Sequence, residues 1–407
     1  MQEISVDDAY QKLQIEISRE RLIATTSNLV RISSENPFSS PAAPGCREQE
    51  IAHFYHKELT ALGFDSELRE VVPGRPNVWG TLFGKEEGFN IMLAGHLDTV
   101  GTKEYKKPFD PRIEEDRLYG RGSCDMKAAL AAYLEVARVI AEANLTLNGN
   151  FTVAGVVDEE YQMIGSRDFG TYGPRADFCI IGEPNNLKVC PAHKGQFSLF
   201  FRTFGKAVHS SIPGAGINAI EKMSKVVQEF EDYNERLSNG KKHELCGHGT
   251  FSPGVIRGGS IVSTVPDFCE MEVDRRILPN ETREQVIDEY RLRLEKIHNH
   301  DPEFRYEISE PSWDISPLDT PVDNLIVKTV TRGYYVVTGK TAAIEAFSGA
   351  TDAPNFACPA VICGPGSLLQ AHSLNEYVEI EQIVDAAKIY LYSVLALLLS
   401  SKTIRKR

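Results

Sequence analysis

The sequence predicts an α/β protein: a larger domain with a mostly parallel sheet covered by helices, and an inserted ferredoxin-like domain of βαββαβ order. Strand-like runs alternate with amphipathic helical stretches in both end parts of the chain, which is typical of a parallel sheet. In the middle part the order changes to strand, helix, two strands, helix and strand. The 407 residues also exceed what one hydrophobic core usually holds, about 250–300 residues.

The first part of the chain opens with two amphipathic helical stretches, at residues 15–32 and 47–62. A long helix begins directly after Asp125, in an alanine-rich and leucine-rich stretch. Disorder is expected only at the two ends of the chain. The other elements predicted here are strands at 66–71, 77–83, 90–94, 151–157 and 178–181, and a short helix near 164–170.

The pattern changes from about residue 190. The predicted elements are a strand at 197–204, a helix at 219–235, strands around 254–257 and 268–276, a helix at 283–298 and a strand at 304–308. After Asp314 the alternation of the first part resumes. We therefore place the inserted domain at 190–311 and the catalytic domain at 1–189 and 312–407.

Charge and composition exclude several classes of protein. A formal net charge of −13 disfavours a nucleic-acid partner, because such proteins need concentrated Lys and Arg. The longest apolar run, 389–399, falls short of the roughly 20 residues that span a bilayer, so no membrane is expected. The N-terminus has no secretory pattern, and the eight cysteines form no CxxC pair. We expect a cytoplasmic protein with reduced thiols.

Candidate functional residues begin with Gly95-His96-Leu97-Asp98, at the end of an apolar strand. Residues two apart on a strand share a face. Asp98 can therefore hold the imidazole of His96, as carboxylates behind metal-bound histidines do. Alone, this pair is a weak signal.

A glycine-bearing turn places Asp125 directly before the long helix. Asp125 can simply be the N-cap of that helix. A carboxylate is, however, also the kind of ligand that bridges two metal ions. A loop for nucleotide phosphates is disfavoured, because neither the GxxxxGK[ST] nor the GxGxxG spacing is met.

Acidic residues also follow two buried strands. Asp158, Glu159 and Glu160 come after one strand, and Glu183 follows the next. A solvated acidic loop is the common fate of such a run. Consecutive side chains diverge, however, so one glutamate can bind a metal while its neighbour faces the metal-bound water as general base.

His372 completes the set, again shortly after an apolar strand. Two histidines and three carboxylates, all at strand ends or helix starts of one predicted sheet, match a dinuclear centre with nitrogen and oxygen ligands and no thiolates. The candidate metal ligands are His96, Asp125, Glu160, Glu183 and His372.

The order of these motifs resembles the family that includes acetylornithine deacetylase, succinyl-diaminopimelate desuccinylase, aminoacylase-1 and carboxypeptidase G2. The resemblance covers nearly the whole chain, and the chain length and the AHKG and GEP contexts favour the acetylornithine deacetylase side of the family. The motifs that carry it are GHLDTV, GRGSCDMK, DEE, GEP, HKG, GKAVHSSIPGAGINAI, DRRILP, GATD and AHSLNE.

This resemblance implies two Zn²⁺ ions, with Co²⁺ also compatible with the ligands. One metal would be bound by His96, Asp125 and Glu183, and the other by Asp125, Glu160 and His372, so that Asp125 bridges. Asp98 would orient His96, and Glu159 would be the general acid and base.

The resemblance also implies a homodimer formed through the inserted domain. His209 would reach the active site of the partner subunit and stabilise the oxyanion of the tetrahedral intermediate. Arg276 would bind the substrate carboxylate, for which a guanidinium is well shaped. Ser263 departs from the family, which often has an asparagine there, so that substrate contacts of the inserted domain can differ.

The function implied is a metal-dependent amidohydrolase that removes the acyl group from an N-acyl amino acid. A dipeptidase or carboxypeptidase acting on short peptides is the alternative within the family. Two further alternatives remain open: a non-catalytic binding protein on the same fold, and catalysis by Cys124 as nucleophile.

Overall fold

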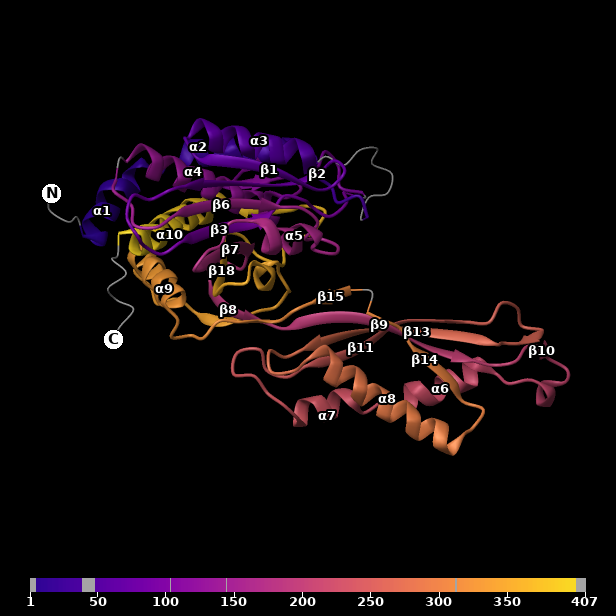
Figure 1. The fold of residues 1–407 in the computed structure, drawn as a ribbon. Coiled ribbons are helices and arrows are strands. Elements are labelled where there is room, and N and C mark those ends of the chain that lie inside the picture. The colour runs from indigo at the N-terminus through magenta and orange to yellow at the C-terminus, as the bar shows by residue number, and fades with distance from the viewer. Residues whose placement is uncertain (1–4, 39–47, 103, 144, 312, 400–407) are drawn as a thin grey trace. The chain divides into compact units, whose positions relative to one another are not determined.

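The computed structural model describes residues 5–38, 48–102, 104–143, 145–311 and 313–399. The chain forms two compact units, coloured along the chain in Figure 1. The first comprises Met1–Pro191, Asp319–Glu345 and Thr351–Arg407, and the second comprises Ala192–Leu318 and Ala346–Ala350. The second unit extends past the predicted boundary at 311 because strand β15 (Trp313–Ile315) pairs with strand β9 of its sheet.

The first unit is built on a nine-stranded sheet. Its four middle strands, β6, β3, β7 and β18, are parallel, which confirms the mostly parallel α/β fold, and the pairs β1–β2, β2–β6 and β18–β8 are antiparallel. In sheet order the strands are β1 (Asp65–Val72), β2 (Arg75–Leu82), β6 (Phe151–Val156), β3 (Ile91–His96), β7 (Phe178–Pro184), β18 (Ala360–Gly364), β8 (Val189–His193) and β16 (Leu318–Asp319), and β17 (Ile344–Phe347) pairs with β8.

Helices pack on both faces of this sheet. On β2, the indole of Trp79 meets the ring of Phe169 edge-on, with centroids 5.3 Å apart, whereas Gly80 faces Leu59. Neighbouring residues on a strand point to opposite faces, so α5 and α3 cover different sides. The helices are α1 (Val6–Leu13), α2 (Arg19–Arg31), α3 (Glu48–Ala61), α4 (Ala128–Glu142), α5 (Ile164–Tyr172), α9 (Leu325–Thr338) and α10 (Ile380–Leu398).

Helix α1 shows that the expectation of a disordered N-terminus is wrong from residue 5 onward. Ser5 caps the helix by accepting a hydrogen bond from the backbone N–H of Asp8. Tyr10 is buried, and its ring meets that of Tyr392 on α10 at 5.3 Å. A second cap, Ser18, makes α2 begin later than predicted. The C-terminal end, residues 400–407, lies outside the described residues.

The second unit has the predicted βαββαβ order, with an antiparallel sheet whose strands follow the order β11-β13-β9-β14. Its elements are β9 (Gly195–Phe204), α6 (Ala219–Glu229), α7 (Tyr233–Asn239), β11 (Thr250–Gly258), β13 (Phe268–Ile277), α8 (Arg283–His300) and β14 (Arg305–Ile308). The single helix predicted at 219–235 is broken, because Phe230 turns into the core and stacks on Phe251 at 5.0 Å.

Shorter elements complete the two units. They are β4 (Arg112–Glu114), β5 (Arg117–Tyr119) and β19 (Tyr377–Glu379) in a small sheet, the pair β10 (Val208–His209) and β12 (Thr264–Val265), and single turns at Gln14–Glu16, Ser123–Lys127, Pro213–Ala215 and Ala353–Phe356. Among the described helices, none combines the length and apolar character needed to cross a membrane. The seven described cysteines are free thiols.

Candidate metal centre

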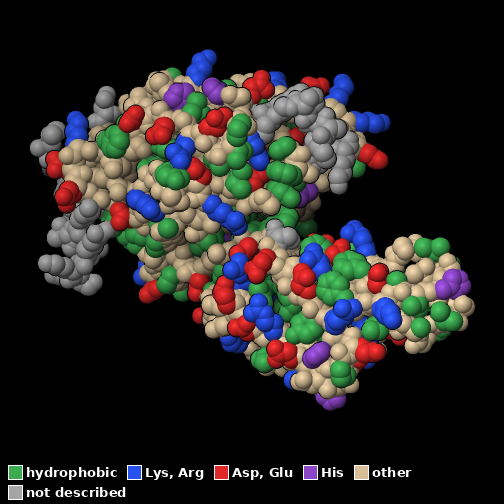
Figure 2. Space-filling model, turned by 45° about the vertical axis from the view of Figure 1, so that its right-hand side comes forward, with side chains coloured by type: hydrophobic (Ala, Val, Ile, Leu, Met, Phe, Trp, Pro, Cys, Tyr) green, Lys and Arg blue, Asp and Glu red, His purple; other side chains and the backbone are tan. Residues whose placement is uncertain are grey.

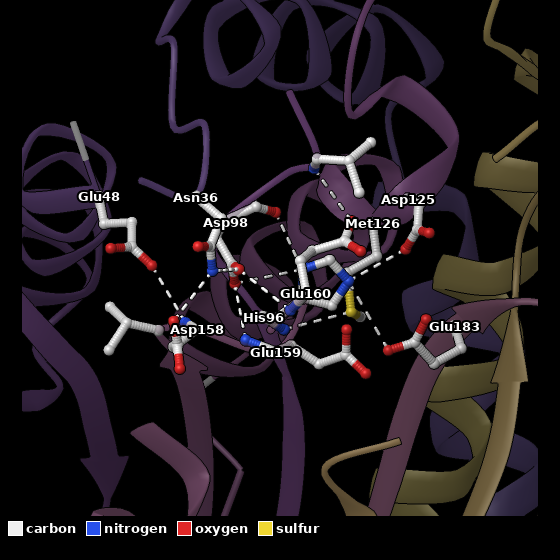
Figure 3. A network of polar contacts seen from close by, with 12 residues as sticks. Asn36, Glu48, His96, Asp98, Asp125, Met126, Asp158, Glu159, Glu160 and Glu183 are labelled. Carbon is white, nitrogen blue, oxygen red and sulfur yellow. Dashed lines mark hydrogen bonds and ion pairs between the residues drawn. The ribbon is translucent and has the colours of Figure 1, made fainter. Parts of the chain in front are cut away.

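The parallel strands bring the predicted residues to one edge of the sheet. Strands β6, β3 and β7 are neighbours and run in the same direction, so their carboxyl ends lie side by side. His96 is the last residue of β3, Glu183 lies near the end of β7, and Glu159 and Glu160 follow β6. Figure 3 shows these side chains gathered at that edge.

Asp125 reaches the same place from the turn that precedes α4. It does not cap that helix: the residue at the N-cap is Lys127, and no side chain makes a capping hydrogen bond there. The turn is held instead by the buried carboxylate of Glu376, which accepts hydrogen bonds from the backbone N–H groups of Gly122, Cys124 and Asp125 at 2.9–3.0 Å. Glu376 therefore fixes where the Asp125 carboxylate points.

The five predicted ligands form one connected cluster. The carboxylate of Asp125 lies between two imidazoles, with Oδ1 3.0 Å from Nε2 of His96 and Oδ2 3.4 Å from Nε2 of His372. The same nitrogen of His372 lies 3.1 Å from Oε2 of Glu160. On the other side, Nε2 of His96 lies 3.8 Å from Oε1 of Glu183. Asp125 thus stands at the centre of the group.

Burial and mutual repulsion shift the titration of this cluster. Burial raises the pKa of Glu159, Glu160 and Glu183, and neighbouring carboxylates add to the effect. Burial would also raise the pKa of Asp125, but hydrogen bonds from both imidazoles outweigh it and hold this pKa low. Hydrogen bonds to Asp125 and Glu160 raise the pKa of His372 to about 10.

The cluster fits divalent cations. Figure 3 shows four carboxylates, those of Asp125, Glu159, Glu160 and Glu183, near the imidazole of His96, and two of them also contact His372. His96, Asp125 and Glu183 are buried, and charges in such a place need compensation. Asp352 is also buried, and its carboxylate lies within electrostatic reach of Glu159 and Glu183. One imidazole nitrogen or carboxylate oxygen from each of His96, Asp125 and Glu160 falls within 4.8 Å of the others. This donor set suits Zn²⁺ or Co²⁺.

Cys124, the alternative nucleophile, is unsuited to that role. Its side chain is buried, and its Sγ lies 3.4 Å from the carbonyl oxygen of Ser367. Burial and the nearby carboxylate of Glu376 raise the pKa of the thiol well above its usual range. Because the thiolate is the nucleophilic form, this environment disfavours catalysis by Cys124.

Asp98 differs from its predicted role in detail. The imidazole Nδ1 of His96 lies 2.9 Å from the backbone carbonyl oxygen of Asp98 and 3.7 Å from its carboxylate. The carboxylate instead accepts hydrogen bonds from the backbone N–H groups of Glu159 and Glu160 and from the side-chain amide of Asn36. These three donors occupy the carboxylate, and the carbonyl is left to orient His96.

Sequence reasoning missed several buried polar residues behind the acidic loop, the segment Asp158–Glu160 that follows β6. Figure 3 shows Asn36, Glu48 and Asp158 beside Asp98, and Arg75 makes ion pairs with Glu48 and Asp158. Asp158 was considered only as part of an acidic run. The others gave no signal, because each is a single polar residue whose partner lies far away in the sequence.

His209 and Arg276 belong to the second unit. His209 is exposed on β10, with Nδ1 2.8 Å from the hydroxyl of Ser211. Arg276 lies on β13, where its Nε is 3.0 Å from Oδ1 of Asp274 and about a third of the side chain is exposed. Both side chains are accessible, and their predicted roles stay predictions.

Comparisons with known proteins agree with the fold and the motifs. The sequence model of Peptidase family M20/M25/M40 matches residues 92–396. The chain is 32% identical to acetylornithine deacetylase of Photorhabdus laumondii over 81% of this chain and 86% of that protein. It is 28% identical to N-formyl-4-amino-5-aminomethyl-2-methylpyrimidine deformylase of Bacillus subtilis, over 93% of this chain and 95% of that protein.

Solved structures resemble the fold over almost the full length. A tripeptidase from Staphylococcus aureus superposes with a TM-score of 0.75 at 24% identity, covering 94% of this chain and 99% of that one. Aminopeptidase PepT from Bacillus cereus gives 0.77 at 21% identity, with the same coverage. From the family match and the sequence identity to acetylornithine deacetylase, we conclude that this chain belongs to Peptidase family M20/M25/M40.

Proposed function

We propose that this protein removes the acyl group from an N-acyl amino acid, using a water molecule activated by two metal ions and Glu159 as general acid and base. Membership in the family makes the chain a hydrolase of amide bonds. The observation that carries the proposal is the carboxylate of Asp125 held between the imidazoles of His96 and His372, with further carboxylates around them.

The proposed metals are two zinc ions, for which cobalt can substitute. His96, Asp125 and Glu183 would hold one ion, and Asp125, Glu160 and His372 the other, in agreement with the contacts among these side chains. When bound, the ions polarise the substrate carbonyl and lower the pKa of the attacking water.

Glu159 is proposed to move the proton. Its side chain lies among the cluster but makes none of the short contacts to the histidines that the proposed ligands make, so its carboxylate is free to accept a proton from water (Figure 3). Burial and the neighbouring Glu183 raise its pKa well above the usual range. A carboxyl group with a raised pKa can hold the proton and then donate it to the leaving amine.

The substrate class rests on the sequence relatives. Both the acetylornithine deacetylase at 32% identity and the deformylase at 28% are named for removing an acyl group from nitrogen. The tripeptidase and the aminopeptidase are structures below 25% identity, and their likeness to this chain concerns the fold. Within the substrate, Arg276 is proposed to bind the carboxylate, since its exposed guanidinium can form a bidentate pair.

A substrate panel tests this proposal. The panel contains N-acetyl-L-ornithine, other N-acetyl and N-formyl amino acids, dipeptides, and N-acyl amines that lack the carboxylate. We expect the N-acyl amino acids to be hydrolysed fastest and the amines without carboxylate at least about tenfold more slowly, because one charged hydrogen-bonded pair is lost. A chelator should stop the reaction, and thiol alkylation should leave it intact. Faster cleavage of dipeptides would favour the peptidase alternative.

We also propose a homodimer formed through the second unit. Strand β11 lies at one end of the sheet order, so that within the described part of the chain one of its edges has no neighbouring strand, and it is exposed along most of its length. Exposed apolar side chains lie on and near it, including Ile256, Ile261 and Val262. Figure 2 shows hydrophobic side chains on the surface of this unit. An open edge with an apolar surround suits antiparallel pairing with a second copy.

Mixing two inactive variants tests whether the dimer shares its active sites. Glu159→Gln and His209→Ala should each be nearly inactive as pure proteins. After unfolding and refolding together in equal amounts, half of the dimers are mixed, and each mixed dimer holds one site with both residues intact. Activity should therefore return to roughly a quarter of the wild-type value. If the mixture stays as inactive as its components, His209 does not act across a dimer.

A further inference from the structure

We infer that Asn36, Glu48, Arg75, Asp98 and Asp158 form a buried clamp that positions Glu159, and that they act through the backbone of the acidic loop. The inference rests on the proposed role of Glu159 as the base. All five residues are buried, with at most 4% of any of them exposed. They come from separate parts of the chain, and Figure 3 shows four of them packed behind the loop.

The clamp binds three successive backbone N–H groups. The N–H of Asp158 donates to Oε1 of Glu48 at 3.0 Å. The N–H groups of Glu159 and Glu160 donate to the two carboxylate oxygens of Asp98, each at 3.1 Å. These amides follow the end of β6, where no sheet partner remains, and a buried amide needs an acceptor. The position of the loop is thus set by side-chain carboxylates.

The bend at Asp158 explains why the loop needs such support. Asp158 has a φ of +71°, in the left-handed region that residues other than glycine rarely adopt. Its side chain accepts hydrogen bonds from Nη2 of Arg75 at 2.6 Å and from the backbone N–H of Gln162 at 3.1 Å. Such a backbone conformation persists only when its surroundings determine it. The bend aims the next residue, Glu159, towards the cluster.

Charge holds the clamp together. Arg75 pairs with both Glu48 and Asp158, so one buried cation compensates two buried carboxylates. The side-chain amide of Asn36 donates to Asp98 at 2.9 Å and to Asp158 at 3.0 Å, and so links two groups of like charge. Removing Glu48 takes away the acceptor of the Asp158 N–H and one of the two carboxylates that pair with Arg75, and removing Asn36 takes a donor from both Asp98 and Asp158, so the loop can then relax away from its position.

Three members of the clamp, Asn36, Glu48 and Arg75, are separate from the metal ligands, whereas Asp98 also accepts the backbone N–H of Glu160 and its carbonyl oxygen lies 2.9 Å from Nδ1 of His96. None of the contacts of Asn36, Glu48 or Arg75 described above involves His96, Asp125, Glu183 or His372. A change in Glu48 or Asn36 should therefore disturb the direction of Glu159 while the metals remain bound. The effect on the position of Glu159 can therefore be measured as kcat per metal-loaded chain, separately from the effect on metal content.

The test compares Glu48→Gln and Asn36→Ala with a matched control, Glu135→Gln. Glu135 is also buried, binds an arginine through both carboxylate oxygens and accepts a backbone N–H, that of Ser18, in the same unit. With the fastest substrate of the panel, both clamp variants should lose about 10–100-fold in kcat per metal-loaded chain. Their KM should stay within about a factor of three, because substrate binding is untouched. The control should keep its kcat.

Equal kcat values per metal-loaded chain for the clamp variants and the Glu135→Gln control would overturn the inference. Asn36→Ala removes no charge, so it decides the question if Glu48→Gln does not fold. The inference can fail while the proposed function stands: in that case Glu159→Gln is inactive and the clamp variants are not. If Glu159→Gln itself is active, the proposed function fails first.

Discussion

Replacing Glu159 with glutamine is expected to lower kcat by about 10²–10⁴-fold and to leave the metal content as in the wild type. Glutamine matches the size of the side chain but cannot accept a proton from water or return it to the leaving amine. The ligands would be untouched, since the contacts of Asp125 to His96 and His372 do not involve Glu159. Metal analysis and steady-state kinetics on the same preparation measure both quantities.

The neighbouring variant Glu160→Gln provides the contrast. Its carboxylate lies 3.1 Å from Nε2 of His372 and is a proposed ligand, so this variant should lose metal together with activity. The two variants, which change adjacent residues of one loop, would then differ in the amount of metal they bind. A zinc-loaded Glu159→Gln enzyme with wild-type turnover would exclude Glu159 as the base.

The sequence was sufficient to predict the edge of the sheet where the chemistry lies. Parallel strands end on the same side, so polar residues at the ends of β3, β6 and β7 had to meet there. The place of His96 and Glu183 at this edge was therefore predictable from strand position, whereas their role as metal ligands was predicted from the whole set of motifs. The positions of Asp125 and His372 could be predicted only from the combination of motifs, because neither residue lies on a strand.

The residues that hold these side chains in place could not be predicted. Glu376 was visible in a motif, but its hydrogen bonds go to backbone groups about 250 residues earlier in the chain. Arg75 and Glu48 are polar residues on a strand and a helix, where charged side chains are usually solvated. Only the fold shows that they are buried and paired.

The two segments that carry Asp125 and Glu159 are held in place in the same way. The turn before α4 is held by the carboxylate of Glu376, and the loop after β6 by those of Asp98 and Glu48. In both places a buried carboxylate accepts backbone N–H groups of, or next to, an acid with a proposed role, Asp125 or Glu159. Backbone anchoring leaves the side chains of Asp125 and Glu159 free to face the cluster, which favours a preorganised site.

Asp125 is the residue whose loss should have the largest effect on the cluster. Replacing it with asparagine is expected to reduce bound metal sharply and to lower kcat/KM by at least about 10³-fold, because both proposed metals lose an anionic ligand. Metal analysis after dialysis, with the exposed Asp110→Asn as control, measures the first effect. Wild-type metal content in Asp125→Asn would contradict its role as the bridging ligand.

The metal-free protein gives a second readout of the same substitution that does not depend on activity. The pKa of His372 is raised to about 10 by hydrogen bonds to Asp125 and, secondarily, to Glu160. Without the charge of Asp125, this pKa should fall towards the ordinary value of about 6.5 but stay above it, because Glu160 remains. An NMR titration of the imidazole measures the shift. With this raised pKa, His372 should hold a proton at pH 7 when no metal is bound, so that metal binding displaces the proton and metal affinity should fall as the pH is lowered.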